Sequence, residues 1–296
     1  MVENTLVVDN VHFSYKKMDI LKGCSLSLTS GQIIGIVAPN GSGKSTLLNI
    51  ISGNLIASSG EVKFNEKTYK RHFEYMKKSI VKMVDQDDLV DYMTGLEHLK
   101  FYAKLFKRSK QDILKVIEEL DIKHYIHKKV NMYSYGMKQR LSFAMAILSD
   151  ASVLLLDEVM NGLDPTNVES TTFILKKLAK TGKIIIIVSH LLDNLDILAD
   201  RVYFLANMNM SYSIKNDERE KEVIDIIFRN NESIKYLLEK LTVPYSLNKN
   251  KLSLVITSDE QIYSIIDKLN MIIHDINEIF VGKKRIHQIY HDIYGL

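Results

Sequence analysis

Nine consecutive residues, Ala38-Pro39-Asn40-Gly41-Ser42-Gly43-Lys44-Ser45-Thr46, constrain the fold of this chain more than any other feature. An apolar stretch before them, residues 32–37, predicts a buried strand, and residues 44–51 predict a helix. A glycine-rich turn ending in Lys-Ser between a strand and a helix is typical of a phosphate-binding loop, because its N–H groups and the helix N-terminus can surround an anion. The context therefore predicts an α/β fold of the P-loop NTPase kind, built around a nucleotide.

Each position of this loop has a chemical task. Lys44 can neutralise the β and γ oxygens of ATP, and Ser45 can ligate Mg²⁺. The residues expected to contact the nucleotide are Asn40, Gly41, Ser42, Gly43, Lys44, Ser45 and Thr46. One position departs from the motif, since Ala38 replaces its first glycine. If this position needs a positive φ, the Cβ atom would cost about 1 kcal/mol.

A second polar site is expected where the apolar stretch 153–156 ends in two adjacent acids, Asp157 and Glu158. Open α/β sheets bind ligands at the carboxyl ends of their strands, which places both acids near the phosphate loop. Asp157 can hold Mg²⁺, and Glu158 is then free to polarise an attacking water. Two such acids can also cap a helix, and only their combination with the phosphate loop favours ATP hydrolysis.

The pattern around these sites predicts one large domain over residues 1–214. Short alternating stretches before residue 28 predict an antiparallel β subdomain. Residues of about 87–150 have apolar positions three and four apart, which predicts a helical subdomain. The continuous apolar runs 153–156 and 184–188 suit strands covered on both faces, as in the core of a mixed sheet.

A charged segment, residues 215–222, marks a boundary, so residues 215–296 are expected to form a second, smaller domain. Its pattern predicts the βαββαβ order of a small α+β, ferredoxin-like domain. The expected ranges are 223–228, 233–241, 245–247, 252–256, 259–269 and 272–279. A terminal helix carries an apolar stripe of Ile286, Ile289, Tyr290 and Ile293, which either packs on this domain or meets a partner.

Charge and hydropathy narrow the possible partners. The net charge of +3 arises from 39 basic and 36 acidic residues and does not indicate a nucleic-acid binder. The apolar runs are far shorter than the roughly 20 residues that cross a bilayer, and no cleavable signal is visible. The single cysteine, Cys24, fits a reducing compartment. We therefore expect a cytoplasmic protein that reaches a membrane only through a partner.

With both sites placed, residues 1 to about 205 resemble the ATP-binding subunits of ABC transporters. The segment Tyr133-Ser134-Tyr135-Gly136-Met137-Lys138-Gln139-Arg140 is similar to the family signature, Leu-Ser-Gly-Gly-Gln and a basic stretch, although Tyr135 replaces a glycine. In the family, the signature of one subunit contacts the γ-phosphate bound to the other. The resemblance implies this role for Ser134 and Gly136, and an ATP-dependent homodimer or heterodimer with a second ATPase subunit.

Smaller motifs of the family match by their order along the chain. Tyr15 lies where the family stacks an aromatic ring on adenine. Gln86 matches the Q-loop glutamine, which implies roles at the metal and in catalysis, and His190 matches the catalytic switch histidine. The segment Asn161-Gly162-Leu163-Asp164 resembles the D-loop.

The resemblance implies an ABC-type ATPase at the cytoplasmic face of the cell membrane, bound to an integral membrane permease subunit. Residues 87–96, which follow Gln86, are the expected docking segment. The signature and the βαββαβ appendage most resemble bacterial exporters of bacitracin, lantibiotics and phenol-soluble modulins, which are amphipathic or antimicrobial peptides. Lipid, drug and polysaccharide exporters share the cassette, so cargo stays open.

A soluble ABC ATPase acting on the ribosome or on DNA is the rival interpretation. Translation-factor relatives carry two cassettes in one chain, and DNA-repair relatives insert a long coiled coil before the signature. Neither feature is seen in these 296 residues, and no nucleic-acid partner is expected.

Overall fold

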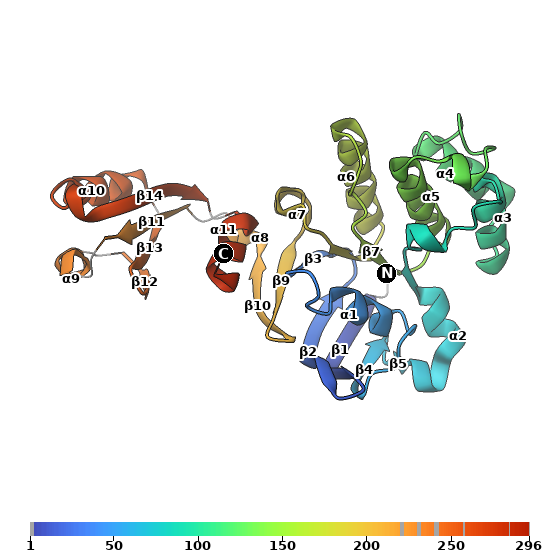
Figure 1. Cartoon of the computed structure of the whole chain (residues 1–296), viewed down its shortest axis with the longest axis horizontal. Helices are drawn as coiled ribbons and strands as arrows, with labels where there is room; N and C mark the ends of the chain where they lie inside the picture. The colour runs from blue at the N-terminus through green and yellow to red at the C-terminus, as the bar shows by residue number, and fades with distance from the viewer. Residues whose placement is uncertain are drawn as a thin grey trace. The chain divides into compact units, whose positions relative to one another are not determined.

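The computed structural model describes residues 3–219, 222–229, 232–239, 243–256, 258–283 and 285–295. Its contacts divide the chain into two compact units, Met1–Ser213 with Ile293–Leu296, and Ile214–Asp292 (Figure 1). The sequence pattern assigns residues 293–296 to the smaller domain, whereas the structure groups them with the larger unit. The reason is Tyr294, whose hydroxyl lies 3.1 Å from the carbonyl oxygen of Val37 and 2.9 Å from that of Leu205.

The first unit begins with an antiparallel sheet in the strand order β2-β1-β4-β5. β1 (Thr5–Tyr15) and β2 (Met18–Thr29) pair as a hairpin, and burial alternates along much of both because one face packs on the core. β4 (Ser59–Phe64) pairs with β1, and the short β5 (Lys67–Thr68) completes the sheet. This sheet is the antiparallel β subdomain of the predicted fold.

A second sheet of six strands, in the order β10-β9-β3-β8-β7-β6, carries the phosphate loop. Its central strands β3 (Ile33–Val37), β8 (Ile184–Val188) and β7 (Val153–Asp157) run parallel to one another. Their apolar side chains are all buried, which explains why these runs are continuous rather than alternating. The other strands are β6 (Ile80–Lys82), β9 (Arg201–Ala206) and β10 (Asn209–Lys215).

The helical subdomain contains α3 (Gly95–Leu105), α4 (Lys110–Glu119) and α5 (Tyr135–Leu148), which lie together in Figure 1. Thr94 and Ser109 begin α3 and α4 with capping boxes, in which the cap side chain and an acid three residues later satisfy each other's N–H groups. The other helical elements of this unit are α1 (Lys44–Ile51), α2 (Tyr69–Ser79), η1 (Gln86–Asp88), η2 (Val130–Met132), α6 (Pro165–Lys180) and α7 (Leu192–Leu198).

The second unit holds an antiparallel sheet in the order β12-β13-β11-β14. Its elements are α8 (Asn216–Arg219), β11 (Glu222–Phe228), α9 (Glu232–Leu238), β12 (Tyr245–Asn248), β13 (Lys251–Ile256), α10 (Asp259–Asn270), η3 (Ile273–Asp275), β14 (Ile276–Lys283) and α11 (Ile286–Tyr294). We propose from the order of its strands and helices that this unit is a ferredoxin-like domain.

The last strand of this unit begins later than the sequence pattern predicts. The expected start of the last strand at residue 272 is wrong, because the chain first curls into η3, where the Asp275 N–H donates to the Ile272 carbonyl at 2.9 Å. Ile286 and Ile289 of the terminal stripe are buried within the chain. Leu241, the expected end of the first helix, lies outside the described residues.

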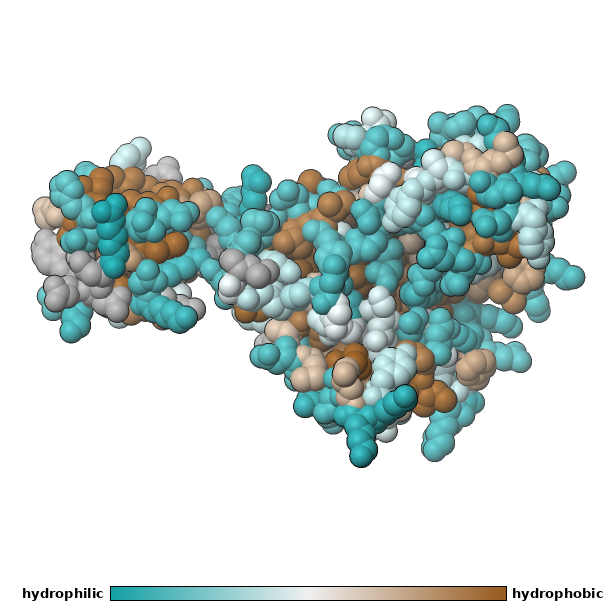
Figure 2. All heavy atoms as spheres, in the orientation of Figure 1, coloured by the Kyte–Doolittle hydropathy of each residue, from teal (hydrophilic) through white to brown (hydrophobic). Residues whose placement is uncertain are grey.

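The surface of the face shown in Figure 2 is mainly hydrophilic, with scattered hydrophobic patches. Within the described ranges, no helix combines the length and apolar character needed to cross a bilayer.

Candidate nucleotide-binding site

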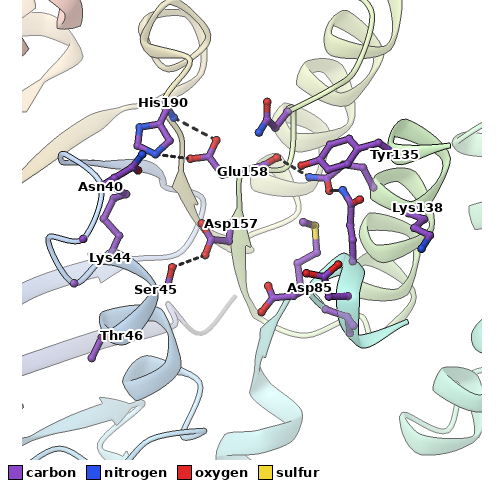
Figure 3. Close-up of a pocket in the computed structure, with 18 of the residues that line it drawn as sticks. Asn40, Lys44, Ser45, Thr46, Asp85, Tyr135, Lys138, Asp157, Glu158 and His190 are labelled. Carbon is purple, nitrogen blue, oxygen red and sulfur yellow. Dashed lines mark hydrogen bonds and ion pairs between the residues drawn. The ribbon is translucent and has the colours of Figure 1, made fainter. Parts of the chain in front are cut away.

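The phosphate loop and the two acids line one pocket of about 800 Å³ (Figure 3). Its walls come from the loop and α1, the turn after β6, the start of α5, the end of β7 and the segment after β8. The predicted site residues that line it are Asn40, Gly41, Gly43, Lys44, Ser45, Thr46, Gln86, Asp157, Glu158 and His190. Folding thus brings together predicted site residues from four separate stretches of sequence.

Four other predicted residues lie outside the lining of this pocket, namely Tyr15, Ser42, Ser134 and Gly136. Tyr15 is 55% exposed at the end of β1 and meets Phe13 edge-on, with 4.9 Å between ring centroids. The hydroxyl of Ser42 is buried in the phosphate loop without a hydrogen-bond partner among the described residues. Ser134 caps α5 with its side chain.

The phosphate loop is shaped by two glycines and one lysine. Gly41 and Gly43 have φ values of 77° and 100°, a region that is open mainly to glycine. The ammonium group of Lys44 donates to the carbonyl oxygens of Ala38 at 2.7 Å and Pro39 at 2.9 Å. Lys44 is only 8% exposed, and burial lowers the pKa of its ammonium group although the carboxylates of Glu158 and Asp157 oppose this.

Ala38, the departure from the motif, fits its position without backbone strain. Ala38 is not among the residues with positive φ in the described part of the chain. The strain energy that a Cβ atom would add at a positive φ therefore does not arise here. Its side chain is 1% exposed and belongs to the hydrophobic core. An alanine at this place therefore contributes apolar packing beneath the loop.

Ser45 and Asp157 are in contact across the pocket. The Ser45 hydroxyl donates to Asp157 Oδ2 at 3.1 Å, and burial raises the pKa of Asp157. Together with the amide of Gln86 they offer hydroxyl, carboxylate and amide oxygens, the hard donors that suit Mg²⁺. No group of three or more His, Cys, Asp or Glu side chains in the described ranges could hold a metal. The oxygens of Ser45, Asp157 and Gln86 therefore fit a Mg²⁺ ion that would also be held by nucleotide phosphates.

Glu158 follows Asp157 and lies beside His190. Its Oε1 is 3.4 Å from His190 Nε2, an ion-pair distance without hydrogen-bond geometry, and its Oε2 is 3.4 Å from the His190 N–H. Burial raises the pKa of Glu158, and the nearby His190 lowers it. The φ of Glu158 is 51°, a left-handed conformation that is uncommon outside glycine and often marks functional positions.

Gln139, which belongs to the signature-like segment but was given no role of its own, connects two predicted site residues. Its side chain is 3% exposed. Its Nε2 donates to the carbonyl oxygen of Glu158 at 2.6 Å, and its Oε1 accepts from Nε2 of Gln86. The available signal was an amide on an apolar helix, because buried amides require hydrogen-bond partners.

Tyr135, the departure in the signature, lines the pocket opposite Lys44 and Ser45 in Figure 3. Its ring packs so closely on Gly162 that a Cβ at that glycine would lie 2.4 Å from the ring. The large residue in the signature is thus accommodated by a glycine in the D-loop-like segment.

Comparison with known proteins agrees with this geometry. A family model described as ABC transporter matches residues 21–161. The ABC transporter ATP-binding protein YdbJ of Bacillus subtilis is 34% identical over 232 residues, covering 76% of this chain and 75% of the relative. The lantibiotic transport ATP-binding protein SrtF of Streptococcus pyogenes is 28% identical over 200 residues, covering 68% and 86%.

Solved structures show the same fold. The ATP-binding subunit of an ABC transporter has a TM-score of 0.68 at 20% identity, covering 73% of this chain and 91% of that chain. A dimeric, post-hydrolysis ATP-binding cassette, MJ0796 bound to ADP and Pi, has a TM-score of 0.65 at 23% identity, covering 71% and 98%. This chain belongs to the family of ABC transporter ATP-binding proteins, and it is an ATPase of that family.

Proposed function

We propose that this chain is the ATP-hydrolysing subunit of a bacterial ABC exporter, which dimerises on ATP and drives a separate integral membrane permease subunit from the cytoplasmic face of the membrane. The observation that carries the proposal is the single pocket that holds Lys44, Ser45, Asp157 and Glu158. It supplies groups for phosphate, for Mg²⁺ and for water activation together.

In this mechanism the residues of the pocket divide the work. Lys44 neutralises the β and γ oxygens, and Ser45, Asp157 and Gln86 would hold Mg²⁺, which when bound spreads the charge of the phosphates. Glu158 orients the attacking water and accepts its proton, a task for which a raised pKa is suited. His190, 3.4 Å away, keeps the carboxylate of Glu158 in place.

The signature completes the site of the second subunit in the proposed dimer. Ser134 is the N-cap of α5, and the N–H groups at a helix N-terminus favour an anion such as the γ-phosphate. In this arrangement ATP is held between the phosphate loop of one subunit and the signature of the other. Hydrolysis then separates the two subunits and resets the permease.

A groove beside residues 87–96 supports docking of the permease. It has a volume of about 640 Å³, and its lining includes Asp88 of this segment together with Phe73, Lys77 and Leu105. Phe73 and Leu105 are 56% and 55% exposed and line the same groove, and apolar side chains that gather on one surface favour a protein partner. We assign this groove to a cytoplasmic segment of the permease.

We further propose that the cargo is an amphipathic or antimicrobial peptide, supported by the likeness to the lantibiotic transport protein SrtF. Cells in which the chain carries Glu158→Gln should become more sensitive to added lantibiotic-type peptides, measured as the inhibitory concentration. Lipophilic drugs provide the comparison. Altered sensitivity to the drugs alone, with peptide sensitivity unchanged, would refute peptide export.

Tyr15→Ala is expected to weaken ATP binding by about 1 to 3 kcal/mol, the usual contribution of an aromatic ring stacked on a base. Tyr15→Phe keeps the ring and should bind ATP as the wild type does. The dissociation constant can be measured with a fluorescent ATP analogue. Equal affinity in all three proteins would show that the exposed ring of Tyr15 does not touch adenine.

His190→Ala is expected to move the acidic limb of the pH profile of kcat to higher pH. His190 lowers the pKa of Glu158, so its removal leaves the effect of burial, which raises this pKa, less opposed. The carboxylate then becomes protonated, and inactive as a base, at a higher pH. Steady-state phosphate release across the acidic range measures the limb. His12→Ala, which removes an imidazole that lies 3.2 Å from Asn10 Oδ1 and outside the pocket, is the control. An unmoved limb in His190→Ala contradicts the assignment.

A further inference from the structure

We propose that Gln139 is a positioning residue that fixes the side-chain orientation of Gln86 and steadies the backbone of Glu158. This inference rests on the proposed function, because it assigns Gln86 to Mg²⁺ and Glu158 to the attacking water. Gln139 lies on α5, within the signature-like segment, and connects this helix to η1 and to the residue that follows β7.

The chemistry of the three groups determines how each amide must face. A main-chain carbonyl oxygen only accepts hydrogen bonds, so Gln139 has to present its NH₂ group to Glu158. The Oε1 atom of Gln139 is then directed to Gln86. Because this oxygen can only accept a hydrogen bond, Gln86 has to present its own NH₂ group to Gln139. The Oε1 atom of Gln86 is left for its other partner. This oxygen is the atom that a Mg²⁺ ion or its bound water would take.

The burial of Gln139 shields its two hydrogen bonds from water. Gln139 is 3% exposed, so water cannot readily substitute for either of its hydrogen bonds. A freely rotating amide at Gln86 would present nitrogen and oxygen in turn, and only the oxygen can ligate a cation. Gln139 thus selects the productive orientation in advance, which is the role of a supporting residue around a metal site.

The same residue holds the left-handed turn at Glu158. The Glu158 N–H donates to the Val188 carbonyl at 2.9 Å, and its carbonyl oxygen accepts from the Asn161 N–H at 2.9 Å and from Gln139 at 2.6 Å. Glu158 has a φ of 51°, which requires such support from its surroundings. Because η1 includes the first residues of the segment 87–96, two hydrogen bonds connect the start of the proposed docking segment to the backbone of Glu158.

This inference can be tested without relying on turnover by measuring the affinity for Mn²⁺ with electron paramagnetic resonance, in the presence of an ATP analogue. Gln139→Met has a similar shape but no amide, and it should weaken Mn²⁺ binding about three- to tenfold. Gln86→Ala should have a similar effect. In the double variant the two effects should be far from additive, because both remove the same oriented oxygen. Affinity for the nucleotide in EDTA should stay within about twofold of the wild type.

A matched control is available on the same helix. Ser142 is fully buried, and its hydroxyl has no hydrogen-bond partner among the described residues, so Ser142→Ala should leave Mn²⁺ affinity unchanged. If Gln139→Met does not fold, Gln139→Glu serves in its place. Its carboxylate cannot donate to Glu158, so it should lower kcat with little change in the KM for ATP.

The role of Gln139 and the proposed function can fail separately. Additive effects in the double variant, or a loss of Mn²⁺ affinity matched by an equal loss of nucleotide affinity in EDTA, would overturn the role of Gln139. Absence of ATP hydrolysis and of ATP-dependent Mn²⁺ binding in the wild type would instead overturn the proposed function.

Discussion

Glu158→Gln is expected to slow ATP hydrolysis by about two or more orders of magnitude while ATP remains bound. The amide has nearly the size of the carboxylate but cannot accept the proton of the attacking water, and general-base catalysis typically contributes a factor of about 10² to 10⁴. Lys44 and Asp157 are untouched, so the groups for phosphate and Mg²⁺ stay in place. The variant should therefore accumulate as an ATP-bound dimer.

Phosphate release and gel filtration in Mg²⁺-ATP measure both parts of this prediction. Glu119→Gln, which neutralises a carboxylate paired with Lys177 at 2.7 Å outside the pocket, is the matched control and should behave as the wild type. Near-normal turnover of Glu158→Gln would show that another residue aligns the water, with His190 the first to examine because of its 3.4 Å contact.

Lys44→Ala is expected to lose nucleotide affinity and the ATP-dependent dimer together. Each charge-assisted hydrogen bond to phosphate contributes about 1.5 to 3 kcal/mol, so a loss of about 3 kcal/mol, or two orders of magnitude in affinity, is the expected scale. The change also frees the carbonyl oxygens of Ala38 and Pro39, which the ammonium group now holds at 2.7 and 2.9 Å. The loop should therefore lose order as well as charge.

Titration with a fluorescent ATP analogue, followed by gel filtration, separates Lys44→Ala from the preceding variant. Lys63→Ala removes a partly exposed ammonium group that pairs with Glu61 at 2.7 Å, and it should leave affinity unchanged. A Lys44→Ala protein that binds ATP normally and still dimerises would contradict the role given to this lysine.

The central elements of the fold could be predicted because their sequence signals are local. β3 and β8 are short, mainly apolar runs buried on both faces, and α1 begins at Lys44, within the phosphate-loop motif. β5 and β6, by contrast, contain two and three residues, too few for a periodicity to be visible. Their strand character depends on pairing with β4 and β7.

Site residues could be predicted where a motif requires a particular residue type at a fixed position. They could not be predicted where the role of a residue depends on its contacts in the folded structure. Lys44, Asp157 and Glu158 follow from the phosphate loop and the acidic strand end. The role of Gln139 depends on how α5 packs against η1 and β7, which no spacing along the chain reveals. The absence of strain at Ala38 and the packing of Tyr135 on Gly162 likewise became evident only from backbone angles and contacts.

The proposal that this ATPase serves a membrane partner is tested most directly by isolating the tagged chain from detergent-solubilised membranes and identifying what accompanies it. We predict an integral membrane protein in a fixed ratio to the chain, and its loss when Leu105→Asp places a charge in the groove beside residues 87–96. ATP binding of that variant should stay unchanged, since Leu105 lies outside the nucleotide pocket. Recovery of ribosomes or DNA in place of a membrane protein would contradict the account.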